Sequence, residues 1–399
     1  MALPYSSAMS SLVWVEIDSE APDRNIRELR RCAGDGVLFC AVVKSNAYGH
    51  GVREIRGLLP SADWLAVNSL DEGIELRQLG ETRPVILLGH VPLERLGEAV
   101  SQGMRLTVFN RETLRALASV AGNPARAFIH LKIETGTGRQ GMLPSEAVGF
   151  ALEAASIPGV VLEGISTHYA NIEDTLNHGY AEEQLRVFRA TLDSLSAAGF
   201  APPIVHTACT AASILFPETH FRMVRAGIGI YGLWPSRETY LSAVMGGRPV
   251  PDLTPVLSWK TRLVQVREMP AGSYIGYGCS YRTTRKSLIG VLPVGYADGY
   301  DRALGNSAHV LIRGRRAPVV GRICMNLTMV DVTDIESPAL EEEVVLLGRD
   351  GDEQIPAEML ASWAGTISYE IVTRISPLLP RIVRPSGGGG GSLRWPSSR

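Results

Sequence analysis

The chain has 399 residues, of which 45% are hydrophobic and 20% charged, which is typical of a soluble globular protein with one large and one smaller domain. Its formal net charge of −2 argues against a basic face for nucleic acid, and no apolar run reaches the roughly 18–20 residues of a membrane helix. The N-terminus lacks signal-peptide features, and the five cysteines form no CxxC pair, so we expect a cytoplasmic protein without disulfides or a metal site.

Short β-rich runs alternate with amphipathic helical patterns from Val37 to about Gly232. The runs are "VLFCAVVK", "WLAVNS", "PVILLGH", "LTVFN", "FIHLKIE", "LEGISTHY", "PIVHTACT" and "RMVRAGIGIYG". Near-continuous apolar strands that alternate with helices indicate a parallel sheet covered on its outer face. Eight such units favour an α/β fold with a TIM-type (β/α)8 barrel over residues 1–245. An open doubly wound sheet would want a GxGxxG turn after the first strand, and the sequence has none there.

The pattern changes after roughly Gly247, beyond a linker in "LSAVMGGRPVPDL". Stretches such as "TPVLSWKTRLVQVREM" and "SLIGVLPVGYADGY" show short alternating strands with Gly, Pro and Asp at the turns. We expect a mostly antiparallel β domain over residues 246–385, which a strand near residues 11–17 joins, with helical content at Pro356–Ala364. Residues 386–399 are rich in Gly and Ser and are predicted to be disordered.

Lys44 ends the first predicted barrel strand, in "AVVKSNAYGHG". The active site of such barrels lies at the C-terminal ends of the strands, so Lys44 should point into that mouth. A lysine that snorkels to water is the common structural explanation, whereas a partly desolvated lysine with a depressed pKa forms Schiff bases readily. Pyridoxal phosphate is the commonest carbonyl partner. Its phosphate would suit the turns at "ACTAAS" (Thr210) and "RAGIGIYG", after the seventh and eighth strands.

These motifs resemble those of the bacterial alanine racemases, in which "AVVKSNAYGHG" is similar to the cofactor-lysine signature. Further motifs follow in the family's order and spacing from about Trp14 to Pro380: "KIETGTGRQG", "GISTHYA", "HTACTAAS", "VRAGIGIYG", "IGYGCSY", "VGYADGY", "GRICMN" and "ISYE". The resemblance implies a pyridoxal-phosphate enzyme that interconverts L- and D-alanine to supply peptidoglycan. It also implies a homodimer with shared active sites.

The resemblance assigns Lys44 as the residue that holds the cofactor and as one catalytic base. Its implied phosphate ligands are Tyr48, Thr210, Gly227, Ile228 and Tyr369. Arg225 would face the pyridine nitrogen, where its permanent charge should discourage ring protonation, weaken the electron sink and favour racemisation over transamination. The structural alternatives are a packing tyrosine at Tyr48 and a salt-bridge arginine at Arg225.

Tyr277 of the partner subunit would be the second base, because one group cannot easily reach both faces of a flat carbanion. His168 would relay polarisation between Tyr277 and Arg225, although a lone histidine is more often structural. The implied substrate-binding residues are Arg139, which would bind or orient the carboxylate, Met325 of the partner subunit, and Tyr296 at the entrance.

Lys132 matches a lysine that is carbamylated in some family members, which would make it an anion able to hold Arg139. The alternative is an ordinary lysine paired with Glu134 or another acid. The sequence departs from the family at Asn326, where a carboxylate is usual, which leaves substrate breadth open. It also has Cys209-Thr210 in place of Asn-Ser, where threonine keeps the hydroxyl. The retained Tyr369 favours alanine over serine.

Five other functions compete with alanine racemisation. A broader or serine-preferring racemase of the same family is the nearest, and a membrane-bound serine racemase is disfavoured by the absence of membrane-spanning runs. A non-catalytic pyridoxal-phosphate carrier would lack the β domain, and an amino-acid decarboxylase would carry a Cys–Asp pair that the matching region lacks. A purely structural or binding protein would not need Lys44, Arg225 and Tyr277 together.

Overall fold

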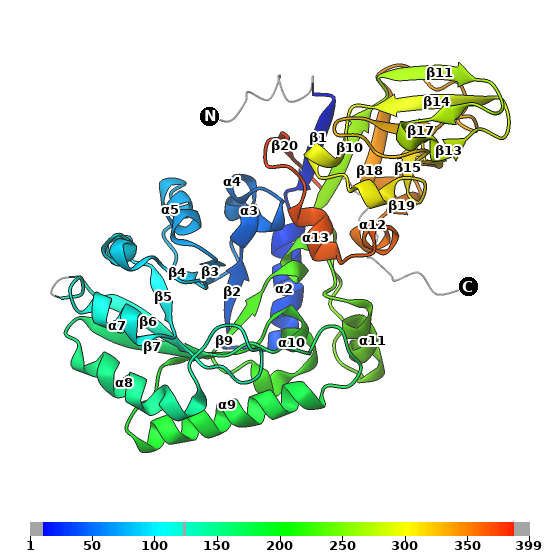
Figure 1. Ribbon diagram of the computed structural model, residues 1–399. Helices are drawn as coiled ribbons and strands as arrows, with labels where there is room; N and C mark the ends of the chain where they lie inside the picture. The colour runs from blue at the N-terminus through cyan, green and yellow to red at the C-terminus, as the bar shows by residue number, and fades with distance from the viewer. Residues whose placement is uncertain (1–10, 123–124, 387–399) are drawn as a thin grey trace. The chain divides into compact units, whose positions relative to one another are not determined.

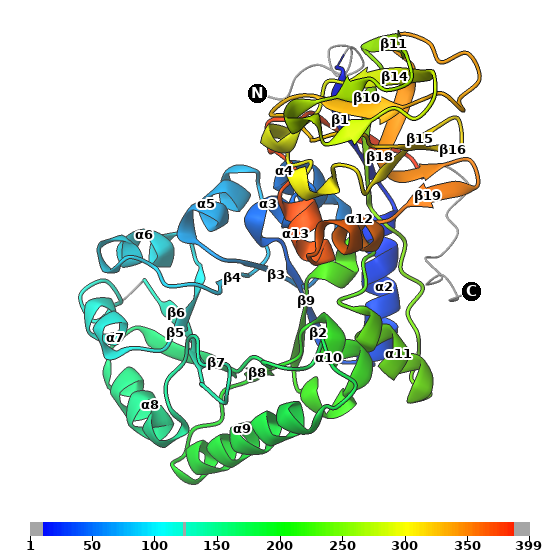
Figure 2. The same cartoon turned by 45° about the vertical axis from the view of Figure 1, so that its right-hand side comes forward.

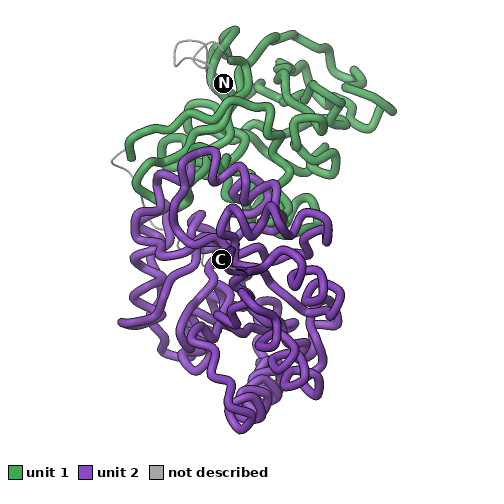
Figure 3. The backbone as a smooth tube through the Cα atoms, turned by 90° about the vertical axis from the view of Figure 1, so that its left-hand side faces the viewer, with its two compact units in different colours: residues 1–21, 48–54, 255–391 green, residues 22–47, 55–254, 392–399 purple. Residues whose placement is uncertain are grey.

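A computed structural model describes residues 11–122 and 125–386, so nearly all of the predicted disordered tail lies outside the described residues. The described chain forms two compact units (Figure 3). The barrel unit comprises Pro22–Ala47 and Ile55–Thr254. The β unit comprises the residues up to Ala21, Tyr48–Glu54 and the residues from Pro255 onward.

Eight parallel strands make up the sheet of the barrel unit, in the order β8-β7-β6-β5-β4-β3-β2-β9 (Figure 1). They are β2 (Leu38–Val42), β3 (Trp64–Val67), β4 (Val85–Leu87), β5 (Arg105–Val108), β6 (Ala127–Lys132), β7 (Val160–Ser166), β8 (Ile204–His206) and β9 (Met223–Ala226). Two backbone hydrogen bonds join the ends of the series: the Arg222 N–H donates to Val205 (3.1 Å) and the Arg225 N–H to Ala208 (2.9 Å). The predicted barrel is confirmed, and the open sheet is excluded.

Helices lie outside the barrel strands, as Figure 2 shows for α5 to α9. They are α2 (Ala21–Ala33), α5 (Leu70–Gln78), α6 (Leu96–Ser101), α7 (Arg111–Leu117), α8 (Ala147–Ser156), α9 (Gly179–Ala197), α10 (Thr210–Leu215) and α11 (Arg237–Met245). Helix α5 begins with a capping box. The Ser69 hydroxyl accepts from the Glu72 N–H (3.3 Å) while the Glu72 carboxylate accepts from the Ser69 N–H (3.1 Å).

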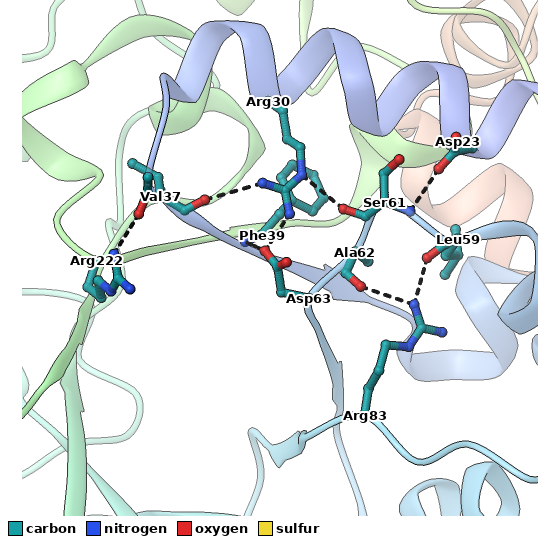
Figure 4. A network of polar contacts seen from close by, with 11 residues as sticks. Asp23, Arg30, Val37, Phe39, Leu59, Ser61, Ala62, Asp63, Arg83 and Arg222 are labelled. Atoms are coloured by element: carbon teal, nitrogen blue, oxygen red, sulfur yellow. Dashed lines mark hydrogen bonds and ion pairs between the residues drawn. The ribbon is translucent and has the colours of Figure 1, made fainter.

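A polar network closes the N-terminal ends of β2 and β3 (Figure 4). Arg30 of α2 donates to the Ser61 carbonyl (2.9 Å) and pairs with the Asp63 carboxylate. The same carboxylate accepts from the Phe39 N–H at 2.7 Å. The network therefore ties one helix to two strands. In this fold that end of the barrel contributes stability, and chemistry belongs to the opposite end.

The β unit contains a main sheet in the order β16-β15-β18-β10-β1-β20, with β19 paired to β18. A second sheet has the order β11-β14-β17, and β12 and β13 form a separate pair. The strands of the main sheet are β1 (Val13–Asp18), β10 (Leu257–Arg262), β15 (His309–Ile312), β16 (Arg315–Pro318), β18 (Glu343–Asp350), β19 (Glu353–Ile355) and β20 (Arg381–Arg384). The others are β11 (Gln265–Met269), β12 (Tyr274–Ile275), β13 (Tyr281–Arg282), β14 (Ser287–Leu292) and β17 (Thr328–Asp331).

Antiparallel pairing dominates this unit, as the sequence predicts. The N-terminal strand β1 pairs antiparallel with β10, from Val13 opposite Thr261 to Ile17 opposite Leu257, and parallel with β20. Short helices α4 (Val52–Ile55), α12 (Ala357–Ala364) and α13 (Ser368–Thr373) complete the regular elements. Across residues 11–122 and 125–386, every helix is too short or too polar to cross a membrane.

Replacing Asp63 by asparagine should lower the free energy of unfolding by about 1–2 kcal/mol, because an acceptor shared by a guanidinium and a backbone N–H becomes partly a donor. Denaturant unfolding followed by intrinsic fluorescence measures the change. Asp35→Asn is the matched control. Asp35 is exposed and lies outside the network, so that change should stay within about 0.5 kcal/mol. Equal unfolding free energies for the two variants would contradict the structural role of Asp63.

Candidate active site

The turn that follows β2 carries Lys44 and has a left-handed backbone. Its φ angles are 55° at Ser45 and 53° at Asn46, Ala47 and Tyr48, within the segment α3 (Lys44–Tyr48). The strand therefore ends at Val42 rather than at Lys44 as predicted. Each such non-glycine residue costs roughly 1–2 kcal/mol, so the surroundings must stabilise the turn. Strain of this kind gathers at functional sites.

Four cationic side chains and a histidine gather at the C-terminal ends of the barrel strands. Lys44 follows β2, Lys132 ends β6, Arg139 lies in the loop after β6, Arg225 is on β9, and His168 follows β7. Burial, followed by the charge of Arg139, lowers the pKa of Lys44. Burial, followed by the charges of Arg225 and Arg139, lowers the pKa of Lys132 to about 8. Both amines therefore lose a proton more easily than an ordinary lysine.

His168 is neutral in this setting. Burial and then the charges of Arg225 and Lys132 lower its pKa to about 3. Its carbonyl accepts from the Thr137 hydroxyl (2.6 Å) and from the Gln184 amide (3.1 Å), which holds its backbone in place. A neutral imidazole can both accept and donate a hydrogen bond, as a relay requires.

Glu134, the acid considered as a partner for Lys132, is already occupied. Its carboxylate accepts from the backbone N–H groups of Gly136 (2.6 Å), Thr137 (2.5 Å) and Arg139 (3.1 Å). It therefore shapes the loop that carries Arg139. Lys132 is left without an acid at ion-pair distance in the part of the chain that the structure describes.

Lysine is rare in this protein, which has four lysines among its 39 lysine and arginine residues. Lys260 pairs with Glu16 and Glu343, and Lys286 pairs with Glu268. The other two are Lys44 and Lys132. An amine can be deprotonated near neutral pH and a guanidinium cannot, so these two positions suit a reaction that uses a neutral amine.

A chain of hydrogen bonds runs from Arg225 into the barrel interior. Guanidinium groups only donate, so the Arg225 Nη1 donates to the Nδ1 of His206 (2.5 Å). His206 must then carry its proton on Nε2, which lies 2.8 Å from the Nδ1 of His130. The Nε2 of His130 in turn donates to the Glu163 carboxylate (3.1 Å). The arginine at one end and the carboxylate at the other determine the same tautomer for both histidines.

The surroundings keep these histidines neutral and Arg225 fully bonded. Burial lowers the pKa of both His130 and His206. Arg225 also donates to the carbonyls of His206 (2.8 Å), Thr167 (2.9 Å) and Thr207 (3.2 Å). Sequence reasoning missed His206, His130 and Glu163. Two predicted barrel strands each contain a histidine. Because every second residue of a barrel strand faces inward, these histidines could have been expected to point into the barrel.

A backbone-lined cradle lies where α10 and β9 meet. The Thr210 hydroxyl accepts from the N–H of Gly227 (3.0 Å) and lies 3.5 Å from the N–H of Gly229. A Cβ on Gly229 would lie 2.7 Å from the Thr210 Cγ2, so only glycine fits. N–H groups and a hydroxyl that converge on one point suit an anion, which would replace the Thr210 oxygen as their acceptor. Together with the cations and the Lys44 amine, this cradle fits the predicted pyridoxal phosphate.

Within the β unit, the predicted residues form two neighbouring pairs. The rings of Tyr48 and Tyr369 lie 6.1 Å apart at 45°. The loops of Tyr296 and Met325 are joined, because the Tyr296 N–H donates to Cys324 (3.1 Å) and the Ala297 N–H to Met325 (3.0 Å). An open pocket of about 510 Å³ lies at this loop, lined by Tyr296, Ala297, Gly299, Asp301, Arg302 and Arg374.

Tyr277 lies on a separate turn of the β unit, between two glycines. Gly276 and Gly278 have φ of 74° and 71°, and a Cβ on Gly278 would lie 2.6 Å from the guanidinium of Arg322. The turn presents the Tyr277 side chain to solvent, where it is 71% exposed. Among residues 11–122 and 125–386, no group of histidine, cysteine or acidic side chains is arranged to hold a metal ion.

The described residues therefore bring the predicted groups together in separate sets. Lys44, Lys132, Arg139, His168 and Arg225 interact in the barrel unit, where Thr210 also meets Gly227. Tyr48 meets Tyr369, and Tyr296 meets Met325, in the β unit.

The chain matches two family models that together cover most of its length. The N-terminal domain of alanine racemase matches residues 17–235, and the C-terminal domain of alanine racemase matches residues 256–383. An alanine racemase of Symbiobacterium thermophilum is 43% identical over 371 residues, which cover 92% of this chain and 96% of that one. One of Leptospira interrogans is 38% identical over 374 residues, covering 93% and 95%.

Solved structures agree with these matches. Alanine racemase from Bacillus anthracis with bound L-Ala-P has a TM-score of 0.87 at 34% identity and covers 96% of both chains. The enzyme from D-cycloserine-producing Streptomyces lavendulae has a TM-score of 0.87 at 34% identity, covering 94% of this chain and 98% of that one. A barrel and a β domain with these matches define an amino-acid racemase, an isomerase. The chain belongs to the alanine racemase family.

Replacing His168 by glutamine should flatten the pH dependence of stability. The histidine has a pKa of about 3 in the folded protein and an ordinary value of 6.5, so between these pH values the unfolded chain binds a proton that the folded chain does not bind. The stability that this group contributes is full above pH 6.5 and is lost as the pH falls toward 3. Between pH 6 and 5 the loss should be smaller in the variant by about 1 kcal/mol. Urea unfolding of the cofactor-free protein at several pH values measures this difference. Parallel plots of unfolding free energy against pH for the variant and the parent would contradict the prediction.

Replacing Gly229 by alanine should destabilise the protein by about 1–3 kcal/mol, because the new methyl group overlaps the Thr210 Cγ2. The double variant with Thr210→Ser removes that methyl group and keeps the hydroxyl, so it should recover most of the loss. Thermal unfolding of the two single variants and the double variant gives the coupling energy. Additive effects would show that the overlap is not the cause.

Proposed function

We propose that this protein interconverts L- and D-alanine with pyridoxal phosphate held at Lys44. Two bases on opposite faces of the substrate would act, Lys44 and Tyr277 of the partner subunit. The observation that carries the proposal is a set of cations in the barrel mouth that make no ion pair among the described residues and that include an amine of lowered pKa. Such a site suits an anionic cofactor that carries an aldehyde.

Pyridoxal phosphate supplies an electron sink that makes the Cα proton of an amino acid acidic. Burial and the charge of Arg139 favour the neutral Lys44 amine, which can then take a proton from Cα. Thr210, Gly227 and Ile228 would bind the phosphate, together with the hydroxyls of Tyr48 and Tyr369. The contact between Thr210 and Gly227 and the contact between the two tyrosines support these assignments.

Arg225 would limit how strongly the cofactor withdraws electrons. Its guanidinium is buried, always charged, and oriented by four acceptors, so it would repel a proton from the pyridine nitrogen. A weaker electron sink gives the Cα carbanion less time to be protonated at another carbon. The residue would thereby favour racemisation over transamination.

Tyr277 would protonate or deprotonate the opposite face of Cα in a homodimer. A turn that holds a tyrosine 71% exposed on two glycines is suited to reach another chain. Other large apolar side chains of the β unit are also exposed, including Tyr274, Met325 and Leu327. A surface of this kind favours a protein partner. His168, neutral and near Arg225, would transmit polarisation to Tyr277.

Arg139 would bind or orient the substrate carboxylate, and Met325 of the partner subunit would contact it through its backbone, with Tyr296 at the entrance. Lys132 would be carbamylated. Its pKa of about 8 leaves a neutral fraction at physiological pH, whose nitrogen attacks carbon dioxide, forms an N–C bond and releases a proton. The resulting anion would balance Arg139, which Glu134 does not do because its oxygens are occupied.

The cellular role that we propose is D-alanine supply for peptidoglycan in the cytoplasm. A racemase of broader specificity is the second candidate. The observation that favours it is the exposed Asn326 beside Met325, where the family usually has a carboxylate. That change removes a negative charge at the substrate entrance.

Racemisation of alanine, serine and lysine enantiomers by the purified protein with added pyridoxal phosphate tests the proposal. Alanine should exceed serine in kcat/KM by roughly tenfold or more, the scale on which a pocket discriminates one small group. Lys44→Ala should abolish both racemisation and visible absorbance of the bound cofactor. Lys44→Arg is the matched control, since it keeps the charge without a removable proton and should be equally inactive. Full activity of Lys44→Ala would overturn the proposal.

The role of Tyr277 has a separate readout in the same assay. Tyr277→Phe should lose deuterium wash-in from solvent mainly for one enantiomer, because only one face of Cα loses its base. Equal losses for both enantiomers would argue against two bases on opposite faces.

A further inference from the structure

One carboxylate joins the turn after β2 to the loop after β3. Glu72, in the first turn of α5, accepts from the Ser45 N–H through Oε1 (2.5 Å). Its Oε2 accepts from the N–H groups of Asn68 (2.7 Å) and Ser69 (3.1 Å). Sequence reasoning did not single out this residue. Its contact at Ser45 lies one residue from Lys44, while its contacts at the other oxygen belong to the N-terminus of its own helix.

Ser45 is the first left-handed residue of the turn, so its N–H lies where the strain begins. A second bond within the turn runs from the Ala47 N–H to the Val43 carbonyl (3.0 Å). Hydrogen bonds to a charged acceptor are roughly twice as strong as neutral ones. Glu72 therefore makes the stronger of these two bonds, at the point that determines the direction in which Lys44 leaves the strand.

The charges around Lys44 give the same residue a second effect. Arg139 after β6 and Lys132 at the end of β6 are cations, and His168 after β7 is neutral. Glu72 on α5 is the carboxylate that raises the pKa of Lys44, against burial and Arg139, which lower it.

We propose that Glu72 is a positioning residue for Lys44, which holds the left-handed turn that presents the amine and supplies the negative charge beside it. This inference rests on the proposed function, in which Lys44 both holds the cofactor and moves a proton. The chain thereby places its catalytic amine between an arginine that favours the neutral form and a glutamate that favours the charged form.

The geometry explains why the residue must be a carboxylate. Both oxygens of Glu72 accept, and the three partners at Ser45, Asn68 and Ser69 are backbone donors. Glutamine at this position would turn an NH2 group toward at least one of these donors and lose that bond. Glu72→Gln would therefore weaken the turn and remove the charge at nearly constant volume.

The test uses the full-length cofactor-free protein with lysines labelled with 13C at Cε. Only four lysine signals are expected, and Lys44→Ala identifies the one of interest. Glu72→Gln should lower the titration midpoint of Lys44, because loss of a nearby anion disfavours the ammonium form. It should also speed amide hydrogen exchange of the segment Ser45–Ala47 by about tenfold, the scale of one lost hydrogen bond to a charged group.

Two control variants separate this role from a general effect on α5. Ser69→Ala removes the other half of the capping box and leaves the Glu72 carboxylate in place. Glu75→Gln removes an exposed charge from the same helix. Neither should change the Lys44 midpoint or the exchange of Ser45–Ala47. The proposal would be overturned if Glu72→Gln had the same Lys44 midpoint and amide exchange rates as the parent. It would also be overturned if Ser69→Ala changed both quantities as Glu72→Gln does.

Glu72→Asp keeps the charge but shortens its reach, and it serves if the glutamine variant does not fold. It should speed exchange in Ser45–Ala47 while holding the Lys44 midpoint nearer to the parent value, and an unchanged exchange rate would count against the proposal. These measurements need neither cofactor nor substrate. Failure to racemise alanine would therefore refute the proposed function and still leave the link between Glu72 and Lys44 tested.

Discussion

Buried positive charge without an ion-pair partner in the described part of the chain is the constraint on which the barrel mouth depends. The nearby carboxylates bond to backbone N–H groups, Glu134 in its own loop and Glu72 in the turn and α5, and of these Glu72 favours the charged form of Lys44. Burying an unpaired charge costs several kcal/mol, so the mouth favours an anionic ligand. An amine can also escape the cost by losing its proton, which arginine cannot do. Lys44 and Lys132 are the two residues of the mouth with that option, and the pKa of each is lowered.

Stabilising contacts and the candidate site lie at opposite ends of the barrel strands. At the N-terminal ends of the strands, Arg30 and Asp63 bind a helix to two strands with ordinary backbone geometry. At the C-terminal ends, the turn after Lys44 is strained, and Arg225 is held by carbonyls and an imidazole. Strain of this kind persists where surrounding contacts fix the backbone, and here the Ser45 N–H donates to Glu72 and the Ala47 N–H to Val43.

The parts of the site that were predictable are those with a local signature. Lys44, Thr210 and Gly227 stand in short motifs at predicted strand ends, and family resemblance attached roles to them. His206 also stands in a recognised strand, but its bonding partners come from β6 and β9. Glu72 reads as an N-terminal capping residue, and its contact at Ser45 joins elements 27 residues apart. The sequence around His206 and around Glu72 does not indicate which distant residue each contacts.

The eight β/α units, the mostly antiparallel β part and the family could all be inferred from the amino-acid sequence alone. These properties follow from hydrophobic periodicity and from the order of the motifs, which can be recognised in the sequence without knowledge of distant contacts. The folded structure was needed to show that β2 ends at Val42, that the backbone is left-handed from Ser45, and which donor each carboxylate accepts from. Backbone angles at a strained turn and the tautomers of two buried histidines depend on groups from distant strands. Those groups meet only when the barrel closes.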